Sequence, residues 1–385
     1  MIKRVLLQPT IYLLTFALFT VACSDDSSDK LKDATEEKNG STGQGGGKMA
    51  NDFKAMGGQG GKANEVDNKS LRDSDGNYVF DKGDQIFQDG TPLEVMTDSS
   101  HHFMPLSPLR VEAVGSTYLQ IVNFAPIPLE NVRVYLSISG GPQRVHLLQI
   151  KSIRAHGIVE LEYPFMGNLD EFLDDNGKAV DLLPYNKSGI RKGDVSFEVE
   201  GDSPLLTAPS SSAELLWKFL LFEHKGNAWV DDLAAQDARL YCAFLINMAH
   251  LFRSKRFEEE LMRENLFVDG SVAMTDDDKK ALLENLRNQE VFRTSVSREV
   301  PPHASKKEAF GVSRDILSGL FLSDDVSMAT HIMGHRAGYG HKSNVTAAQE
   351  DTGLSLVVKR VKNEMLQNDE FPITTDNYYS PEDLK

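Results

Sequence analysis

Fifteen residues near the C-terminus, THIMGHRAGYGHKSN at 330–344, constrain this chain more than any other segment. His331 and His335 are four residues apart, so on a helix they share one face. Gly338 can adopt a positive φ and end that helix, which lets His341 approach the same point from outside it. The spacing predicts that three neutral imidazoles converge on one divalent metal ion. Zinc is the first candidate, because no thiolate competes for the site.

The residues before the cluster support a helix. Ser323 is a suitable N-cap, Asp324 and Asp325 suit a first helical turn, and the pattern predicts a helix that continues to about Arg336. Three imidazole ligands leave a fourth zinc position open, which is typical of catalytic rather than structural sites. Two alternatives stay open: histidines that line a metal-free helix end, and a spacing without chemical meaning.

The cluster resembles the metzincin metalloproteases, whose motif is His-Glu-x-x-His-x-x-Gly-x-x-His. The resemblance implies that the three histidines are zinc ligands and that Gly338 is the turn glycine. The following segment, SNVTA at 343–347, resembles the Ser-x-Met segment that underlies the zinc in that family, with Val345 in place of the methionine. The resemblance covers mainly the C-terminal end of the chain.

One departure from the motif concerns catalysis. The glutamate that follows the first histidine in the family is Ile332 here, and an isoleucine cannot transfer a proton. A general base typically contributes about 10²–10⁴-fold to rate, so a conventional peptidase mechanism is expected to be impaired. Zinc binding does not need this residue. A base from elsewhere in the chain, such as Glu350 or Asp351, is the remaining route to hydrolysis.

The N-terminus resembles a bacterial lipoprotein signal. Lys3 and Arg4 precede a short apolar stretch at 11–21, and Thr-Val-Ala-Cys follows at 20–23. The resemblance implies that residues 1–22 are removed and that Cys23 carries lipid, which attaches the protein to a membrane. The alternative is an ordinary signal anchor with an incidental cysteine.

Residues 23–70 are rich in Gly, Ser, Asn, Asp and Lys, and such a composition predicts a flexible tether. The acidic start SDD at 24–26 resembles sorting signals that carry some lipoproteins to the cell surface. We therefore expect a location in the bacterial cell envelope, at the outer membrane or cell surface rather than the inner membrane.

The rest of the chain divides by its periodicity into an α+β architecture. Residues 71–205 contain short runs rich in Val, Ile, Tyr and Phe between turn signals, which predicts an antiparallel β-sandwich. DSDGNYVFDKGD at 73–84 has oxygen ligands at intervals, but it lacks the glycine and glutamate of an EF-hand, so we expect a turn. Residues 206–385 predict a mainly helical, metzincin-like domain with helices at 212–225, 231–264, 276–292, 323–336 and 353–366.

The remaining titratable residues carry no predicted chemistry. Cys242 lies in an apolar run and is expected to be buried, and the histidines outside the cluster are expected to be packing or surface residues. These include His101, His156 and His250. A formal net charge of −16 argues against a nucleic-acid partner, since such proteins concentrate Lys and Arg.

These observations predict a lipid-anchored, extracytoplasmic zinc-binding protein that resembles a metallopeptidase and is catalytically weakened or inactive. The alternative is a non-catalytic surface or periplasmic lipoprotein that binds a protein or a glycan.

Overall fold

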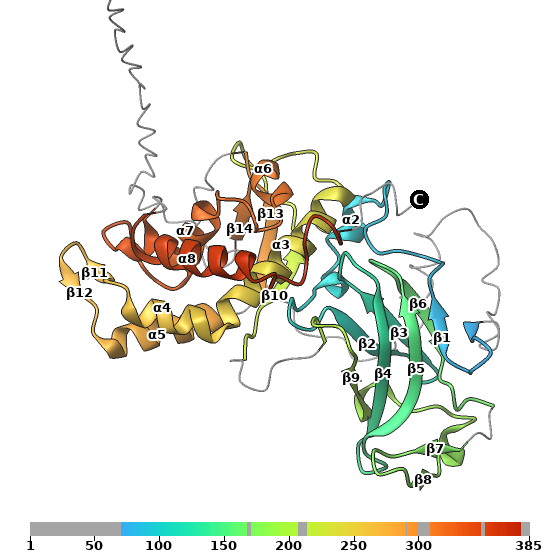
Figure 1. The fold of residues 1–385 in the computed structure, drawn as a ribbon. Coiled ribbons are helices and arrows are strands. Elements are labelled where there is room, and N and C mark those ends of the chain that lie inside the picture. The colour runs from blue at the N-terminus through green and yellow to red at the C-terminus, as the bar shows by residue number, and fades with distance from the viewer. Residues whose placement is uncertain are drawn as a thin grey trace, which may run out of the picture. The chain divides into compact units, whose positions relative to one another are not determined.

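A computed structural model of the chain describes residues 71–167, 171–206, 214–289, 291–298, 309–347 and 351–378. The fold of these residues is mixed α/β, with several helices and several sheets (Figure 1). The predicted signal peptide, Cys23 and the predicted tether lie outside the described residues. Within the described ranges, no helix is both long and apolar enough to cross a membrane.

The N-terminal half is built from strands, as the sequence predicts. One sheet has the strand order β1-β5-β4-β9 and another has the order β2-β3-β6 (Figure 1). The pairs are antiparallel except that β1 joins β5 in parallel, which the predicted antiparallel sandwich did not include. The strands are β1 Tyr78–Phe80, β2 Leu109–Val114, β3 Tyr118–Asn123, β4 Leu129–Ile138, β5 Val145–Ile153, β6 Ile158–Glu162 and β9 Val195–Glu200.

Shorter elements complete this half. Strands β7 and β8 pair as a small antiparallel ladder, and the helical pieces are single turns. Their bounds are β7 Phe172–Leu173, β8 Ala179–Val180, α2 Leu93–Met96, η2 Ser99–His101, η3 Leu183–Tyr185 and η4 Lys192–Asp194.

Strand β4 shows why these segments are extended. Val132, Val134 and Leu136 are fully buried, while Arg133 and Tyr135 between them are exposed and half-buried, respectively. This alternation confirms the predicted period of two and places one face of the strand in the core.

The acidic segment at 73–84 forms the predicted turn. The Asp73 carboxylate accepts hydrogen bonds from the backbone N–H groups of Asp75 and Asn77, at 2.9 and 3.0 Å. Gly76 has a φ of +84°, and β1 begins two residues later. The carboxylate that a calcium loop would use first is therefore engaged in an Asx turn.

The C-terminal half contains helices and a parallel sheet that the sequence-based prediction missed. Strands β10, β13 and β14 lie in that order, and both pairs are parallel. The elements of this half are β10 Lys218–Leu221, α3 Ala235–Arg253, α4 Lys255–Arg263, β11 Phe267–Asp269, β12 Val272–Ala273, α5 Asp276–Arg287, β13 Val291–Val296, β14 Ala309–Val312, α6 Arg314–Ser318, α7 Ser327–Arg336, η5 Asn344–Thr346 and α8 Gly353–Gln367.

The predicted helix at 212–225 was wrong, because residues 218–221 form strand β10. Trp217, Phe219 and Leu221 are buried, whereas Lys218 between the first two is exposed. The surrounding run is apolar at nearly every position, so it fits both a helical and an extended period, and the sheet partner β13 decides between them. The helix predicted at 276–292 ends at Arg287 instead, because β13 begins at Val291.

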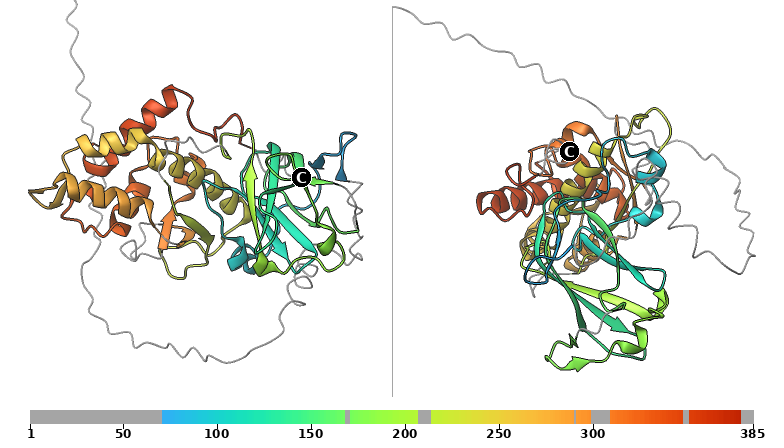
Figure 2. Two further views of the ribbon diagram at one scale, coloured as in Figure 1. Left: turned by 90° about the horizontal axis from the view of Figure 1, so that it is seen from below. Right: turned by 90° about the vertical axis from the view of Figure 1, so that its right-hand side faces the viewer.

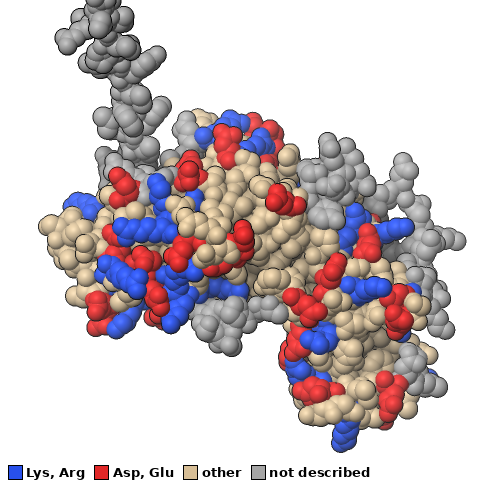
Figure 3. Space-filling view, viewed as in Figure 1, with Lys and Arg blue, Asp and Glu red and all other residues tan. Residues whose placement is uncertain are grey.

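The helices predicted at 231–264 and 353–366, and the predicted start of the helix at 276, agree with the structure. The region 231–264 forms two abutting helices, and Ser254 ends α3 and caps α4 by accepting from Phe257 N–H. Thr275 caps α5 in a reciprocal capping box with Asp278. Helices α4, α5 and α8 lie side by side in both views of Figure 2, and acidic and basic side chains alternate over them on the face shown in Figure 3.

One histidine of the N-terminal half, His156, is deeply buried. His156 is 1% exposed, and within the described residues neither ring nitrogen has a hydrogen-bond partner. Burial, and then the charge of Arg239, lower the pKa of His156 to about 3 from its ordinary value of 6.5. Its backbone has a φ of +52°, a conformation that asparagine tolerates better than most residues.

We expect acid to destabilise the protein through His156. Between pH 6.5 and about 3 the unfolded chain binds a proton at this residue and the folded chain does not, so the free energy of unfolding falls as the pH falls. Urea unfolding of the chelator-treated protein at pH 7 and pH 4.5 measures the loss. His156→Asn should reduce that loss by about 2–3 kcal/mol, from a shift of about 1.4 kcal/mol per pH unit. Equal losses in both proteins would contradict the assignment.

Candidate metal centre

Helix α7 carries the first two histidines of the cluster. It begins at Ser327 with Val326 as N-cap, whereas the predicted N-cap was Ser323. The residues from Gly319 to Ser323 are occupied by a tight turn instead, in which Ser323 N–H donates to Gly319 O. The helix ends at Arg336 as predicted, and Gly338 follows with a φ of +99°.

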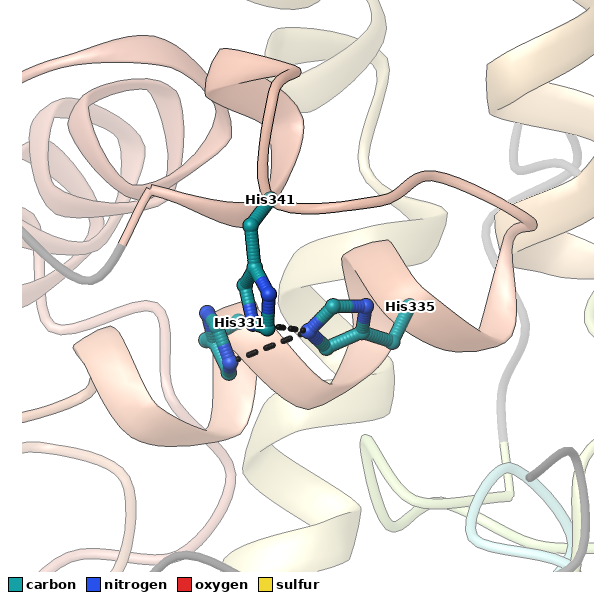
Figure 4. A group of neighbouring side chains, drawn as sticks. All are labelled: His331, His335 and His341. Atoms are coloured by element: carbon teal, nitrogen blue, oxygen red, sulfur yellow. Dashed lines mark hydrogen bonds between the residues drawn. The ribbon is translucent and has the colours of Figure 1, made fainter. Parts of the chain in front are cut away.

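The three histidines of the motif meet in space (Figure 4). His335 Nε2 lies 3.1 Å from His331 Nε2 and 3.0 Å from His341 Nε2. His331 and His335 are buried, with 5% and 8% exposure, whereas His341 is exposed. Two imidazole nitrogens bound tetrahedrally to one zinc ion at about 2.0–2.1 Å are about 3.3 Å apart, so the observed separations are close to those of a metal site.

The opposite ring nitrogens determine which nitrogens face the cluster centre. His331 Nδ1 donates to Thr346 O at 2.6 Å, and His335 Nδ1 donates to Tyr339 O at 2.9 Å. A carbonyl oxygen can only accept, so each Nδ1 carries a hydrogen, and in a neutral ring the Nε2 is then a lone-pair acceptor. Hydrogen bonds of this kind from the far nitrogen orient metal-bound histidines.

The lone pairs on His331 Nε2 and His335 Nε2 face each other across 3.1 Å, and they repel unless a cation lies between them. A proton could serve this purpose, but the surroundings oppose it. Burial first, and the neighbouring histidines after it, lower the pKa of His331 to about 4, against a raising effect of its bond to Thr346. His331 is therefore neutral at neutral pH, which is the form that binds metal. The cluster could hold a metal ion.

A glycine inside α7 allows the next segment to pass beneath the histidines. A Cβ atom on Gly334 would lie 2.6 Å from Val345 O and 3.0 Å from Thr346 Cγ2. Only a hydrogen at position 334 permits this approach, and the approach brings Thr346 O within reach of His331. The segment that resembles the family's Ser-x-Met element thus lies against the helix, with Val345 fully buried.

No general base joins the cluster within the residues that the structure describes. The group of possible metal ligands there consists of the three imidazoles alone. Ile332 is fully buried in the hydrophobic core, Asp351 is exposed, and Glu350 lies outside the described residues.

The sequence predicted that the three histidines meet, but it did not predict the groups that orient His331 and His335. The acceptors for His331 and His335 are backbone carbonyls, and every residue carries one, so no residue type marks them. Gly334 is the one sequence signal of this packing. A glycine inside a helix lowers stability by about 1 kcal/mol relative to alanine, so its presence there indicates a close neighbour.

Comparison with known proteins identified no relative: no family model, curated protein or solved structure matches the chain. The assignment of this centre therefore depends on its own geometry.

Proposed function

We propose that this chain is a zinc-binding protein of the metallopeptidase type whose catalytic power is weakened, held outside the cytoplasm by lipid on Cys23. One observation carries the proposal. Three Nε2 atoms converge while the Nδ1 hydrogens of His331 and His335 are committed to carbonyls, so these two rings present lone pairs to the centre of the cluster. Zinc suits a set of imidazoles without thiolate or carboxylate.

The finer fold belongs to the same proposal. We expect a β-sandwich followed by a metzincin-like domain, with a boundary near residue 206. The two sheets of the N-terminal half support the first part. A helix with two histidines, a glycine turn and a third histidine supports the second. The outer membrane or cell surface is the expected location, through the lipoprotein signal.

The chemistry open to the site is limited by Ile332. A bound zinc ion would polarise a substrate carbonyl and acidify a water molecule. At the position where the metzincin motif has its proton-accepting glutamate, this chain has Ile332, which is fully buried in the hydrophobic core. This burial also favours the second candidate, a non-catalytic lipoprotein that binds a protein or a glycan near the metal.

Restoring the glutamate of the family motif is expected to fail. Ile332→Glu places a carboxylate in the core, and an unpaired buried charge costs about 3–5 kcal/mol. Urea unfolding should show this loss, whereas the volume-conserving control Ile332→Met should lose less than about 1.5 kcal/mol. A stable Ile332→Glu variant that cleaves peptides only when metal is bound would show that position 332 faces a cleft.

The activity of the natural chain separates the two candidates. Hydrolysis of a generic protein substrate is measured with the zinc-loaded protein, with the chelator-treated protein and with His335→Ala. Because the usual base is absent, we expect a rate about 10²–10⁴-fold below that of a conventional peptidase, and still above the two controls. Equal rates in all three samples favour the binding lipoprotein.

A further inference from the structure

The third histidine of the centre has no regular element of its own. His341 lies in the loop between α7 and η5, and unlike the other two histidines it is exposed. A ligand on an exposed loop must be held by other contacts if the site is to exist before the metal arrives. The contacts of this loop therefore decide how well the centre binds metal.

The loop is fastened on both sides of His341. On the inner side, Gly340 O accepts from Ser343 N–H at 2.9 Å and from Thr346 Oγ1 at 2.8 Å. On the outer side, Lys342 O accepts from Gly270 N–H at 2.8 Å. Gly270 is the turn residue of the hairpin formed by β11 and β12, about seventy residues earlier in the chain.

Asn344 provides the strongest connection to that hairpin. Its Oδ1 accepts from Phe267 N–H at 2.8 Å, and its Nδ2 donates to Asn265 O at 2.9 Å. The neighbouring Ser343 Oγ donates to Phe267 O at 2.6 Å. The side chains at 343 and 344 thus pair with the outer edge of β11 as a neighbouring strand would.

The position of Asn344 is itself fixed from the other side. Gly353, at the start of α8, has a φ of +57°, and a Cβ atom there would lie 1.9 Å from Asn344 O. Asn344 is therefore held between α8 and the hairpin, three residues after the ligand.

We infer that Asn344 is a positioning residue: by joining the β11–β12 hairpin to the loop, it holds His341 at the place where the metal binds. This inference rests on the proposed metal site. It assigns the hairpin a role in metal affinity, although none of its residues belongs to the cluster.

Replacing Asn344 should lower metal affinity strongly, because its bonds hold the loop in the metal-binding arrangement before the metal arrives. An isolated two-stranded hairpin is marginally stable in water, so the hairpin and the ligand loop stabilise each other through these bonds. Without Asn344 the loop becomes ordered only when the metal binds. The entropic cost of ordering the loop then makes the free energy of metal binding less favourable. Removing groups that orient metal ligands typically lowers metal affinity about 10–100-fold.

A double-mutant cycle tests whether Asn344 acts through His341. Zinc affinity is measured by competition with a chelating dye for the parent, Asn344→Ala, His341→Ala and the double variant. We expect Asn344→Ala to weaken binding about 10–100-fold in the parent and less than about 3-fold once His341 is gone. At saturating cobalt, the visible spectrum of Asn344→Ala should resemble that of the parent and differ from that of His341→Ala, because the third imidazole still binds once the loop is ordered.

The controls separate positioning from general damage. Asn368→Ala removes an exposed asparagine that pairs only locally with Glu370 among the described residues, and it should leave affinity unchanged. Asn344→Asp keeps the acceptor for Phe267 N–H and loses the donor to Asn265, so it should fall between the parent and Asn344→Ala. It replaces Asn344→Ala in the cycle if that variant does not fold.

Two results would overturn the inference: the same loss of affinity with and without His341, or no loss at all. Both leave the proposed metal site intact. A parent protein that binds no zinc would instead contradict the proposed function, and that result is known before any variant is made.

Discussion

His335→Ala is expected to abolish stoichiometric metal binding, together with the stability that metal adds. His335 Nε2 is the central atom of the cluster, since it lies 3.1 and 3.0 Å from the other two. At a free zinc concentration one hundred times the dissociation constant, the parent should gain about 2.7 kcal/mol in the free energy of unfolding. The variant should gain nothing at the same concentration. Urea unfolding with and without zinc measures both values.

The matched control for this variant is His102→Ala. His102 lies in the N-terminal half, where its Nδ1 donates to Ser99 O, and it is far from the motif in sequence. Its removal should leave the zinc-dependent gain intact. If zinc stabilised the parent and His335→Ala equally, the metal would bind elsewhere and the centre described above would be wrong.

Gly334→Ala is expected to destabilise the protein and to weaken metal binding. Helix propensity alone predicts the opposite sign, because alanine favours an α-helix over glycine by about 1 kcal/mol. The new Cβ would lie 2.6 Å from Val345 O, so α7 and the segment below it must separate. We expect a loss of about 1–3 kcal/mol, typical of overpacking. The separation also lengthens the bond from His331 Nδ1 to Thr346 O that orients the first ligand.

Gly340→Ala is the control for Gly334→Ala. A Cβ atom at position 340 would meet no heavy atom within 4 Å among the described residues, so this change in the same region should be nearly neutral. Unfolding free energies and zinc affinities of the two variants are compared directly. A Gly334→Ala protein more stable than the parent would show that propensity outweighs packing here, and that the segment does not lie beneath the helix.

The meeting of the three histidines was predictable from sequence because local geometry determines it. A spacing of four places His331 and His335 on one face of any helix, and Gly338 supplies the turn that a third ligand needs. Strand β4 was predictable for a similar reason, since its alternation is a local property. Thr275 and Ser254 mark helix ends by hydrogen bonds to residues only a few positions away.

Other features depend on partners distant in sequence, and no local pattern reports them. Residues 218–221 are apolar enough for helix or strand, and they become β10 because β13 lies beside them. Asn344 is an ordinary turn residue until β11, 77 positions earlier in the chain, supplies the N–H that it accepts from. The burial of Ile332 is also a tertiary fact, and it changes the meaning of the missing glutamate. Position 332 lies in the core, so a glutamate there would be buried in the packing of α7.

The proposed function requires that the three Nε2 atoms bind one zinc ion. X-ray absorption at the zinc edge, on protein purified with zinc and dialysed to remove the excess, measures this coordination. We predict one zinc ion per chain with three imidazole nitrogens at about 2.0–2.1 Å, and loss of one imidazole in His341→Ala. A protein that retains no zinc, or one whose zinc has the same ligands in His341→Ala as in the parent, would contradict the account.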